Sequence, residues 1–236
     1  LLETHVWLQE NKRDIPPTLF QQNNDAFQED RAMRLTASYH RYFKLWNLNL
    51  RSAYFNEELK YKDADFSKLS ENKSQTFINE ILMNKSIGRN LWILGANNTY
   101  AKSYSIDFSE LHPIQNKMAL FSSFQYVNKK ANFVAVASVR QEWINTNQVP
   151  LTWSFGVDYY LTKWLKTKAN AAKVYRIPTI NDLFWKEGGN QNLLPEYGYA
   201  FESGLMLVIP KNKKKYSLTF ELTAFSRQIE NWIIWL

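Results

Sequence analysis

Apolar and polar side chains alternate with a period of two along most of the chain, and this pattern restricts the fold more than any other feature of the sequence. In residues 151–161, for example, Trp153, Phe155 and Val157 alternate with small or polar residues. Successive side chains of a β-strand point to opposite faces, whereas a helix would spread this pattern around its axis. The sequence therefore predicts an all-β fold.

The alternation predicts about eleven strands, most of them roughly ten residues long or slightly longer. Strands of soluble sheets average about five or six residues, whereas a tilted strand needs about 9–11 residues to cross a bilayer. The strand lengths therefore favour an antiparallel transmembrane β-barrel. The expected strands cover residues 3–9, 31–42, 46–56, 74–84, 91–103, 117–127, 132–144, 151–161, 165–175, 198–209 and 216–230.

The connections between these strands alternate in size. Short connections are expected at residues 43–45, 85–90, 128–131, 162–164 and 210–215. Long connections are expected at residues 10–30, 57–73, 104–116 and 176–197, and the brief segment 145–150 is the exception. Barrels of the bacterial outer membrane have short periplasmic turns and longer extracellular loops, so this sorting supports the barrel interpretation.

The net charge of +7 and the aromatic content of 16% would also suit a nucleic-acid-binding protein. The basic excess, however, falls in the short connections, which contain no acidic residue. There it would meet anionic lipid headgroups beside aromatic residues at one rim of the barrel, so we expect lipid and not nucleic acid as the partner. The basic residues are Lys44, Lys85, Arg89, Lys129, Lys130, Lys163, Lys211, Lys213, Lys214 and Lys215.

Motifs for catalysis, metal binding or cofactor binding are missing from the sequence. The chain has no cysteine, no glycine-rich phosphate loop, no His-Glu-x-x-His and no Gly-x-Ser-x-Gly, and its three histidines are far apart in sequence. No run of 18 apolar residues is present either, which excludes a transmembrane helix. We therefore expect neither an enzyme nor a metal or cofactor site.

Residues 174–196 break the alternation and form the strongest candidate for a recognition loop. This segment contains Pro178, Pro195 and adjacent glycines at 188–189, and it mixes aromatic with amide and charged side chains. Loops held by a rigid scaffold commonly carry recognition, whereas a self-packed loop that only caps the barrel is the alternative. The candidate ligand-binding residues are Arg176, Asn181, Asp182, Phe184, Trp185 and Asn190.

Several segments together resemble the TonB-dependent outer-membrane receptors of Bacteroidetes-type bacteria, in the cobalamin-receptor-like branch. The most specific of them is the run Arg-x-Pro-Thr-x-Asn-Asp-Leu-x-Trp at residues 176–185. The matching segments are 3–7 (ETHVW), 12–18 (KRDIPPT), 138–142 (SVRQE), 175–185 (YRIPTINDLFW), 188–190 (GGN), 194–196 (LPE) and 224–236 (AFSRQIENWIIWL).

This resemblance implies a bacterial outer-membrane barrel of about 22 strands, filled by an N-terminal plug that contacts the TonB complex. Residues 1–236 would then form a partial barrel domain, with the plug and the terminal strands outside this sequence. Charged residues on the lumen side would hold the plug. The candidates are Arg34, Arg51, Arg140, Glu142, Glu202, Glu221 and Arg227.

The resemblance also implies uptake of a scarce, large ligand with energy relayed through TonB. A corrinoid such as cobalamin is the expected ligand, and a ferric siderophore or haem is the alternative, because receptors for these ligands share the architecture. A hypothesis from another class is an outer-membrane barrel without transport activity that serves as a surface docking or assembly component, with loops that dock a lipoprotein partner.

Overall fold

A computed structural model describes residues 1–16, 25–62, 69–145, 147–210 and 217–234, and it confirms the all-β prediction. The long strands are β1 (Leu2–Asp14), β2 (Phe27–Tyr42), β3 (Asn47–Lys62), β4 (Leu69–Ile87), β5 (Asn90–Ser105), β6 (Ile114–Val127), β7 (Phe133–Ile144), β9 (Thr152–Tyr160), β10 (Leu165–Arg176), β11 (Glu196–Pro210) and β12 (Ser217–Glu230). A two-residue strand, β8 (Asn147–Gln148), and a short helix, α1 (Ile180–Phe184), complete the described elements. No helix in this part of the chain is long and apolar enough to cross a membrane.

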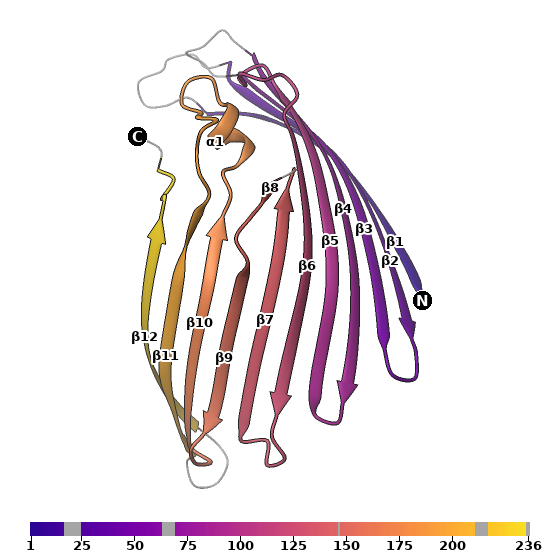
Figure 1. Ribbon diagram of the computed structural model, residues 1–236. Coiled ribbons are helices and arrows are strands. Elements are labelled where there is room, and N and C mark those ends of the chain that lie inside the picture. Colours follow the sequence, from indigo (N-terminus) through magenta and orange to yellow (C-terminus); the bar gives the residue numbers. More distant parts are fainter. Residues whose placement is uncertain (17–24, 63–68, 146, 211–216, 235–236) are drawn as a thin grey trace.

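All long strands belong to one antiparallel sheet, in which each long strand pairs with the next one along the chain. Strand β8 pairs only with the end of β7. Figure 1 shows the sheet curving from β1 at one open edge to β12 at the other, with short turns gathered at one end and long connections and α1 at the opposite end. The sorting of connections by size is confirmed for the short turns after β2, β4, β6 and β9 and for the long connections after β5 and β10, whereas the connection expected at 57–73 is limited to residues 63–68.

The strand register separates the side chains into two chemically different faces. Directly paired residues share a face, and one row of such pairs runs Val6, Leu35, Tyr54, Phe77 and Tyr100 across five strands. This face carries most of the large apolar side chains that are exposed to solvent. They include Leu8, Leu35, Phe77, Ile81, Leu94, Leu120, Val139, Phe155, Leu205, Phe220 and Leu222.

The opposite face is polar over much of its area. One of its rows runs Ser38, Arg51, Glu80, Asn97 and Ala119, and continues to Glu142 on β7. Among the described residues, few apolar side chains are buried, namely Ala26, Phe108, Ala119 and Val149 together with Pro113 and Pro178. A soluble domain would bury its apolar face against a second layer, so this sheet is built to place that face against lipid.

Polar side chains within the apolar face are hydrogen-bonded to one another. Ser52 Oγ donates to Asn79 Oδ1 at 2.8 Å, and Trp92 Nε1 donates to Ser122 Oγ at 2.9 Å. Lipid offers no hydrogen-bond partner, so an unpaired group would cost several kcal/mol there. These cross-strand pairs allow polar residues to remain within a lipid-facing band.

The strands extend further toward the long connections than the alternation predicted. Strand β1 continues to Asp14, five positions past the expected end at residue 9, and β4 begins at Leu69 where residue 74 was expected. These extensions are polar, and cross-strand pairs such as Lys60–Glu71 join them. Cross-strand charged pairs add a modest stabilisation to a strand above the bilayer, and they leave no apolar alternation in the sequence. The connections expected at 145–150 and 176–197 also contain structure, namely β8 and α1.

The basic residues of the short connections lie at one rim, as predicted, for the part of the chain that the structure describes. Lys85 Nζ lies 5.0 Å from the ring centroid of Trp46, and the Arg41 guanidinium lies 4.9 Å from that of Phe43. Cations beside exposed aromatic rings are typical of a membrane interface. The four lysines at 211–215 lie outside the described residues, and the attraction of this rim to anionic lipid stays a prediction.

Candidate ligand-binding site

The loop between β10 and β11 begins with a capped helical turn. Thr179 is the N-cap of α1, and its hydroxyl accepts a hydrogen bond from the Asp182 backbone N–H at 3.1 Å. The Asp182 carboxylate accepts one from the Thr179 backbone N–H at 2.8 Å, which completes a capping box. Pro178 precedes the cap, where its restricted backbone favours the extended entry. The Pro-Thr-x-Asn-Asp sequence thus fixes the start of α1 locally.

Arg176 ties this loop to the top of the sheet. Its guanidinium lies 3.5 Å from Asp182 Oδ2 and 3.1 Å from Glu196 Oε1, and both carboxylates are largely buried. Glu196 also accepts a hydrogen bond from the Ile233 backbone N–H at 2.8 Å. Two of the predicted ligand-binding residues, Arg176 and Asp182, therefore lie in an anchor that positions the loop.

The β10–β11 loop contacts the β5–β6 connection, which lies several strands away in the sheet. The rings of Trp185 and Phe108 meet edge to face with centroids 6.5 Å apart. The Ser109 N–H donates to the Phe184 carbonyl at 2.7 Å, and the Lys186 N–H donates to the Asp107 carbonyl at 2.9 Å. The contribution of the β5–β6 connection could not be predicted, because nothing in its sequence indicates which loop it meets.

Gly189 permits the tight return of the chain after α1. Its N–H donates to the Trp185 carbonyl at 2.7 Å, and a Cβ atom at this position would lie 2.5 Å from the Trp185 backbone nitrogen. No side chain fits in that space without displacement of the backbone. Gly189 therefore holds the position of Trp185.

Replacement of Gly189 by valine is expected to displace the loop at a local cost of about 1–3 kcal/mol while the barrel stays folded. Limited proteolysis of the full-length protein should then cleave faster after Lys186, and heat-modifiable gel migration should be unchanged. Gly88→Asn is the matched control, because an added Cβ meets nothing within 4 Å there and asparagine tolerates the φ of +61°. Equal cleavage rates for the two variants would contradict the role of Gly189.

A cavity of about 600 Å³ lies between α1 and the inward face of β1–β5. Two predicted residues, Asn181 and Trp185, line it together with Arg34 and Glu57 from β2 and β3. Because α1 follows β10, far from these strands in the sheet, they can share one cavity only on the concave side. The polar face is therefore the lumen side. The remaining lining residues are Gln9, Gln28, Asp30, Arg31, Ala32, Glu58, Leu59, Asn72, Lys73, Ser74, Ser103, Tyr104 and Phe108.

The charges on the inward side of the cavity include no excess of cations. Its carboxylates at 30 and 57 lie with Arg34 on the inward face, whereas the register places Arg31, Glu58 and Lys73 on the outward face of the same strands. Amide and hydroxyl groups supply most of the other polar contacts. Arg34 donates to Glu57 Oε1 through Nε at 2.9 Å and through Nη2 at 2.6 Å. At the same end of the barrel, the Lys62 ammonium donates to Asp25 and holds the pKa of that carboxyl below its usual value.

The other predicted ligand-binding residues lie in the same loop without lining the described cavity. The Phe184 carbonyl takes part in the contact between loops, and Asn190 donates its N–H to the Asp182 carbonyl at 2.8 Å. The sequence did not predict that strand residues would line this cavity, and Arg34 was predicted only as a plug-contacting residue of the lumen. The alternation of side chains along a strand identifies the face that each residue occupies. It does not indicate how close that residue lies to the β10–β11 loop.

All seven residues predicted to face the lumen lie on the inward face: Arg34, Arg51, Arg140, Glu142, Glu202, Glu221 and Arg227. Most of them are paired within the sheet. Arg51, for example, lies 3.2 Å from Glu80 Oε1. Lys168 lies 3.6 Å from Glu202 Oε1 and donates to Glu221. Arg227 has no ion pair within the described part of the chain. Contact with a plug stays a prediction for all seven.

Long antiparallel strands, an apolar outward face, a polar lumen and loops that enclose a cavity at one end together define a segment of an outer-membrane β-barrel receptor. Comparison with known families gives the more particular assignment. The chain belongs to the family described as TonB dependent receptor-like, beta-barrel, which matches residues 4–236. The members of this family are outer-membrane receptors and transporters.

Curated and solved relatives agree with this family. A segment of 84 residues, 36% of the chain, is 33% identical in sequence to the vitamin B12 transporter BtuB of Photobacterium profundum. This match covers 13% of the transporter's length. The structure of the Serratia marcescens hemophore receptor HasR, solved as a double mutant with its hemophore HasA and heme, superposes with a TM-score of 0.75 at 12% sequence identity. The match covers 88% of the present chain and 41% of the HasR chain. The siderophore receptor PirA of Pseudomonas aeruginosa superposes with a TM-score of 0.71 at 10% sequence identity. This match covers 86% of the present chain and 40% of the PirA chain. The chain thus spans less than half of each of these proteins, and the two structures show the fold alone.

Proposed function

We propose that the complete protein is a TonB-dependent receptor of the bacterial outer membrane that imports a corrinoid such as cobalamin. The observation that carries this proposal is the cavity of about 600 Å³ on the lumen side, closed by Asn181 and Trp185 from the β10–β11 loop. Its volume lies within the range of about 300–1,000 Å³ that ligand sites occupy. A corrinoid would extend beyond the cavity into the lumen.

The lining of the cavity favours a corrinoid over the alternative ligands. Ferric siderophore complexes are commonly anionic and call for an excess of cations, whereas the inward charges of this cavity, at Asp30, Arg34 and Glu57, provide no such excess. Haem proteins hold the iron through an axial side chain, most often histidine, and no histidine lines this cavity as described. The carboxamide groups of a corrinoid match a lining rich in amides and hydroxyls, and the curated relative with 33% identity is a vitamin B12 transporter.

The inward charges would hold a plug in the complete barrel. Arg51 lies 3.2 Å from Glu80, and such a solvent-accessible pair can exchange partners at small cost. Arg227 offers five N–H donors to an incoming carboxylate or carbonyl. Through this plug the receptor would contact TonB, which supplies the energy for transport.

A barrel without transport that docks a surface lipoprotein is the alternative from another class. Such a protein needs an outward-facing loop surface, whereas Trp185 and Asn181 line a cavity in the lumen. The placement of these side chains favours uptake. A surface lipoprotein would then act as a second partner above the same loops.

Equilibrium binding to the purified full-length receptor in detergent tests the ligand assignment. We expect cobalamin to bind with a Kd below 1 μM, and haem and a ferric catecholate siderophore to bind at least about tenfold more weakly. Absence of cobalamin binding at micromolar concentration would contradict the corrinoid assignment. Tight binding of one of the other two ligands would replace it within the same architecture.

A further inference from the structure

Two asparagines lie on the outward face of the β4–β5 hairpin, within the band of side chains that faces lipid. Asn79 on β4 and Asn98 on β5 pair directly with each other. The aromatic pair Phe77–Tyr100 lies one row nearer the long connections, and apolar pairs follow on the side of the short turn. Aromatic rings mark the level of the membrane interface, so the two amides lie below that level, among the acyl chains.

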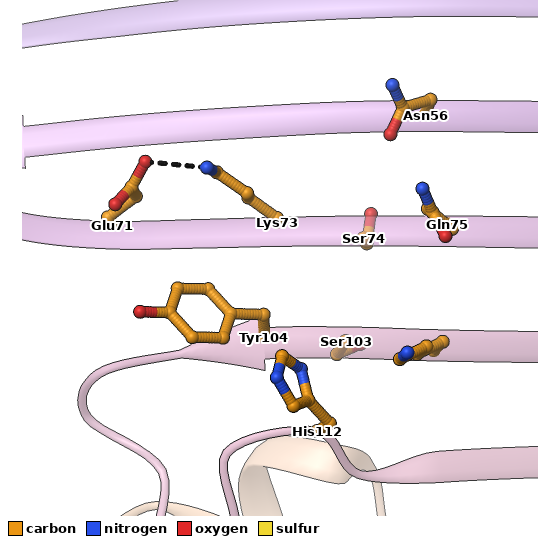
Figure 2. Close-up of a pocket in the computed structure, with 9 residues that line it drawn as sticks. Asn56, Glu71, Lys73, Ser74, Gln75, Ser103, Tyr104 and His112 are labelled. Atoms are coloured by element: carbon orange, nitrogen blue, oxygen red, sulfur yellow. Dashed lines mark ion pairs between the residues drawn. The ribbon is translucent and has the colours of Figure 1, made fainter.

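Polar side chains are ordinary on the other side of this aromatic row, where water reaches them. Figure 2 shows such a region on β3 and β4, with Asn56 and Gln75 on the outward face and Lys73 Nζ 2.9 Å from Glu71 Oε1. Hydrocarbon holds no water that could complete the hydrogen bonds of an amide, so a group left unpaired there is costly. An amide at the level of Asn79 therefore requires a polar partner.

The sheet satisfies one part of each amide and leaves the other part open. Asn79 Oδ1 accepts from Ser52 Oγ at 2.8 Å. Asn98 Nδ2 donates to Asn116 Oδ1 at 2.7 Å and to the Lys117 carbonyl at 3.2 Å. Within the described part of the chain, the Nδ2 donors of Asn79 and the Oδ1 acceptor of Asn98 have no partner, and the Asn79 side chain is exposed. One amide thus offers donors, and its neighbour offers an acceptor.

A two-fold axis along the membrane normal brings these donors and acceptors together. All copies of a receptor insert in the same direction, so residues of two neighbouring copies meet at similar depths. In an isologous contact, residue i meets residue j of the second copy while j meets i. With the axis between β4 and β5, the Asn79 donors face the Asn98 acceptor of the second copy, and the reverse pair forms at the same time. Ala96, in the next row toward the short turn, adds little bulk beside this axis.

We propose that the outward face of the β4–β5 hairpin is a lateral interface through which two copies of the complete receptor associate in the membrane. Two symmetry-related hydrogen bonds between Asn79 and Asn98 hold the contact, and apolar side chains such as Ile81 pack around them. A second copy is the occupant because one patch carries both the donors and the acceptor, whereas an acyl chain offers neither. The proposal requires a membrane-inserted barrel but not the corrinoid assignment.

Counting of subunits in lipid vesicles tests this interface. The full-length receptor is labelled with one fluorophore per chain, reconstituted over a range of protein-to-lipid ratios, and scored for dimers by stepwise photobleaching. We expect a dimer whose fraction rises with protein density. Asn79→Ala should weaken the association at least about tenfold, because it removes both symmetry-related hydrogen bonds. Asn84→Ala is the matched control on the same strand and should leave the association unchanged, because Asn84 pairs with Asn47 and Ile93 on the inward face.

Cross-linking of mixed copies tests the two-fold geometry. The sequence has no cysteine, so Asn79→Cys and Asn98→Cys each place a single thiol in this part of the receptor. In a mixed dimer of these two variants, the thiols face each other while the other Asn79–Asn98 pair stays intact. A short thiol-reactive cross-linker should therefore join the two variants to each other more efficiently than it joins either variant to itself.

A receptor that is monomeric at every protein density would overturn the proposal, and so would an equal loss of dimers in Asn79→Ala and Asn84→Ala. Equal cross-linking of the mixed and unmixed variants would overturn it as well. Heat-modifiable gel migration checks that each variant is folded, and the unaltered receptor decides the question of dimerisation even if a variant is not. Cobalamin binding, measured in parallel, should be the same in all variants, so the two proposals fail independently.

Discussion

An arginine in place of Ile81 is expected to destabilise the folded barrel by about 2–4 kcal/mol. Ile81 is half-exposed on the outward face of β4, where it pairs with Leu50 and Ala96. It lies between the aromatic row at Phe77 and the short-turn end at Lys85. A guanidinium at that depth must leave water for hydrocarbon, or distort the bilayer around it, so the folded state in lipid loses stability.

The matched control is Ile78→Arg, in the same strand and from the same parent residue. Ile78 pairs with Ala53 and Thr99 on the lumen side, where a charged side chain reaches water. The measurement is urea unfolding of the full-length protein in lipid vesicles, followed by tryptophan fluorescence. We expect Ile78→Arg to cost less than about 1 kcal/mol. Equal losses for the two variants would contradict the assignment of the two faces.

Replacement of Trp185 by alanine is expected to weaken ligand binding by about 10- to 100-fold. Trp185 lines the lumen cavity and packs against Phe108, so its removal deletes an aromatic contact with ligand and loosens the junction between two loops. The strands that form the rest of the cavity are unaffected. Titration of the purified full-length receptor with labelled cobalamin measures the loss.

Two further variants separate the roles of Trp185. Trp185→Phe keeps a ring against Phe108 and should recover a large part of the affinity. Trp164→Ala removes a half-exposed tryptophan from the short-turn end and should leave the affinity unchanged. If Trp164→Ala and Trp185→Ala weakened binding equally, the ligand would not depend on the cavity at the long-connection end.

The membrane-spanning parts of the strands could be predicted from the sequence because their physical cause is local. A residue such as Ile81 faces lipid and its neighbour Glu80 faces the lumen, and the sheet requires this alternation at every step. The ends of the strands could not be predicted in the same way. There, Glu58 and Lys60 on β3 form charged pairs with Lys73 and Glu71 on β4, and the local sequence does not indicate these partners.

The candidate site could be predicted only in part for a related reason. The cap at Thr179 and Asp182 follows from residues three positions apart, so the sequence indicates it directly. The approach of Trp185 to Phe108, and of Asn181 to the β2–β4 strands, depends on the curvature of the whole sheet. Residue patterns record which face a side chain occupies but not which distant loop reaches it.

Uptake of radiolabelled cobalamin by cells that carry the full-length receptor tests the central claim most directly. The account predicts energy-dependent accumulation that is abolished when TonB is deleted and reduced at least about tenfold by Trp185→Ala, with equal receptor levels in the membrane. Cells without the receptor set the background. Accumulation no greater than this background, or accumulation that persists without TonB, would contradict the account.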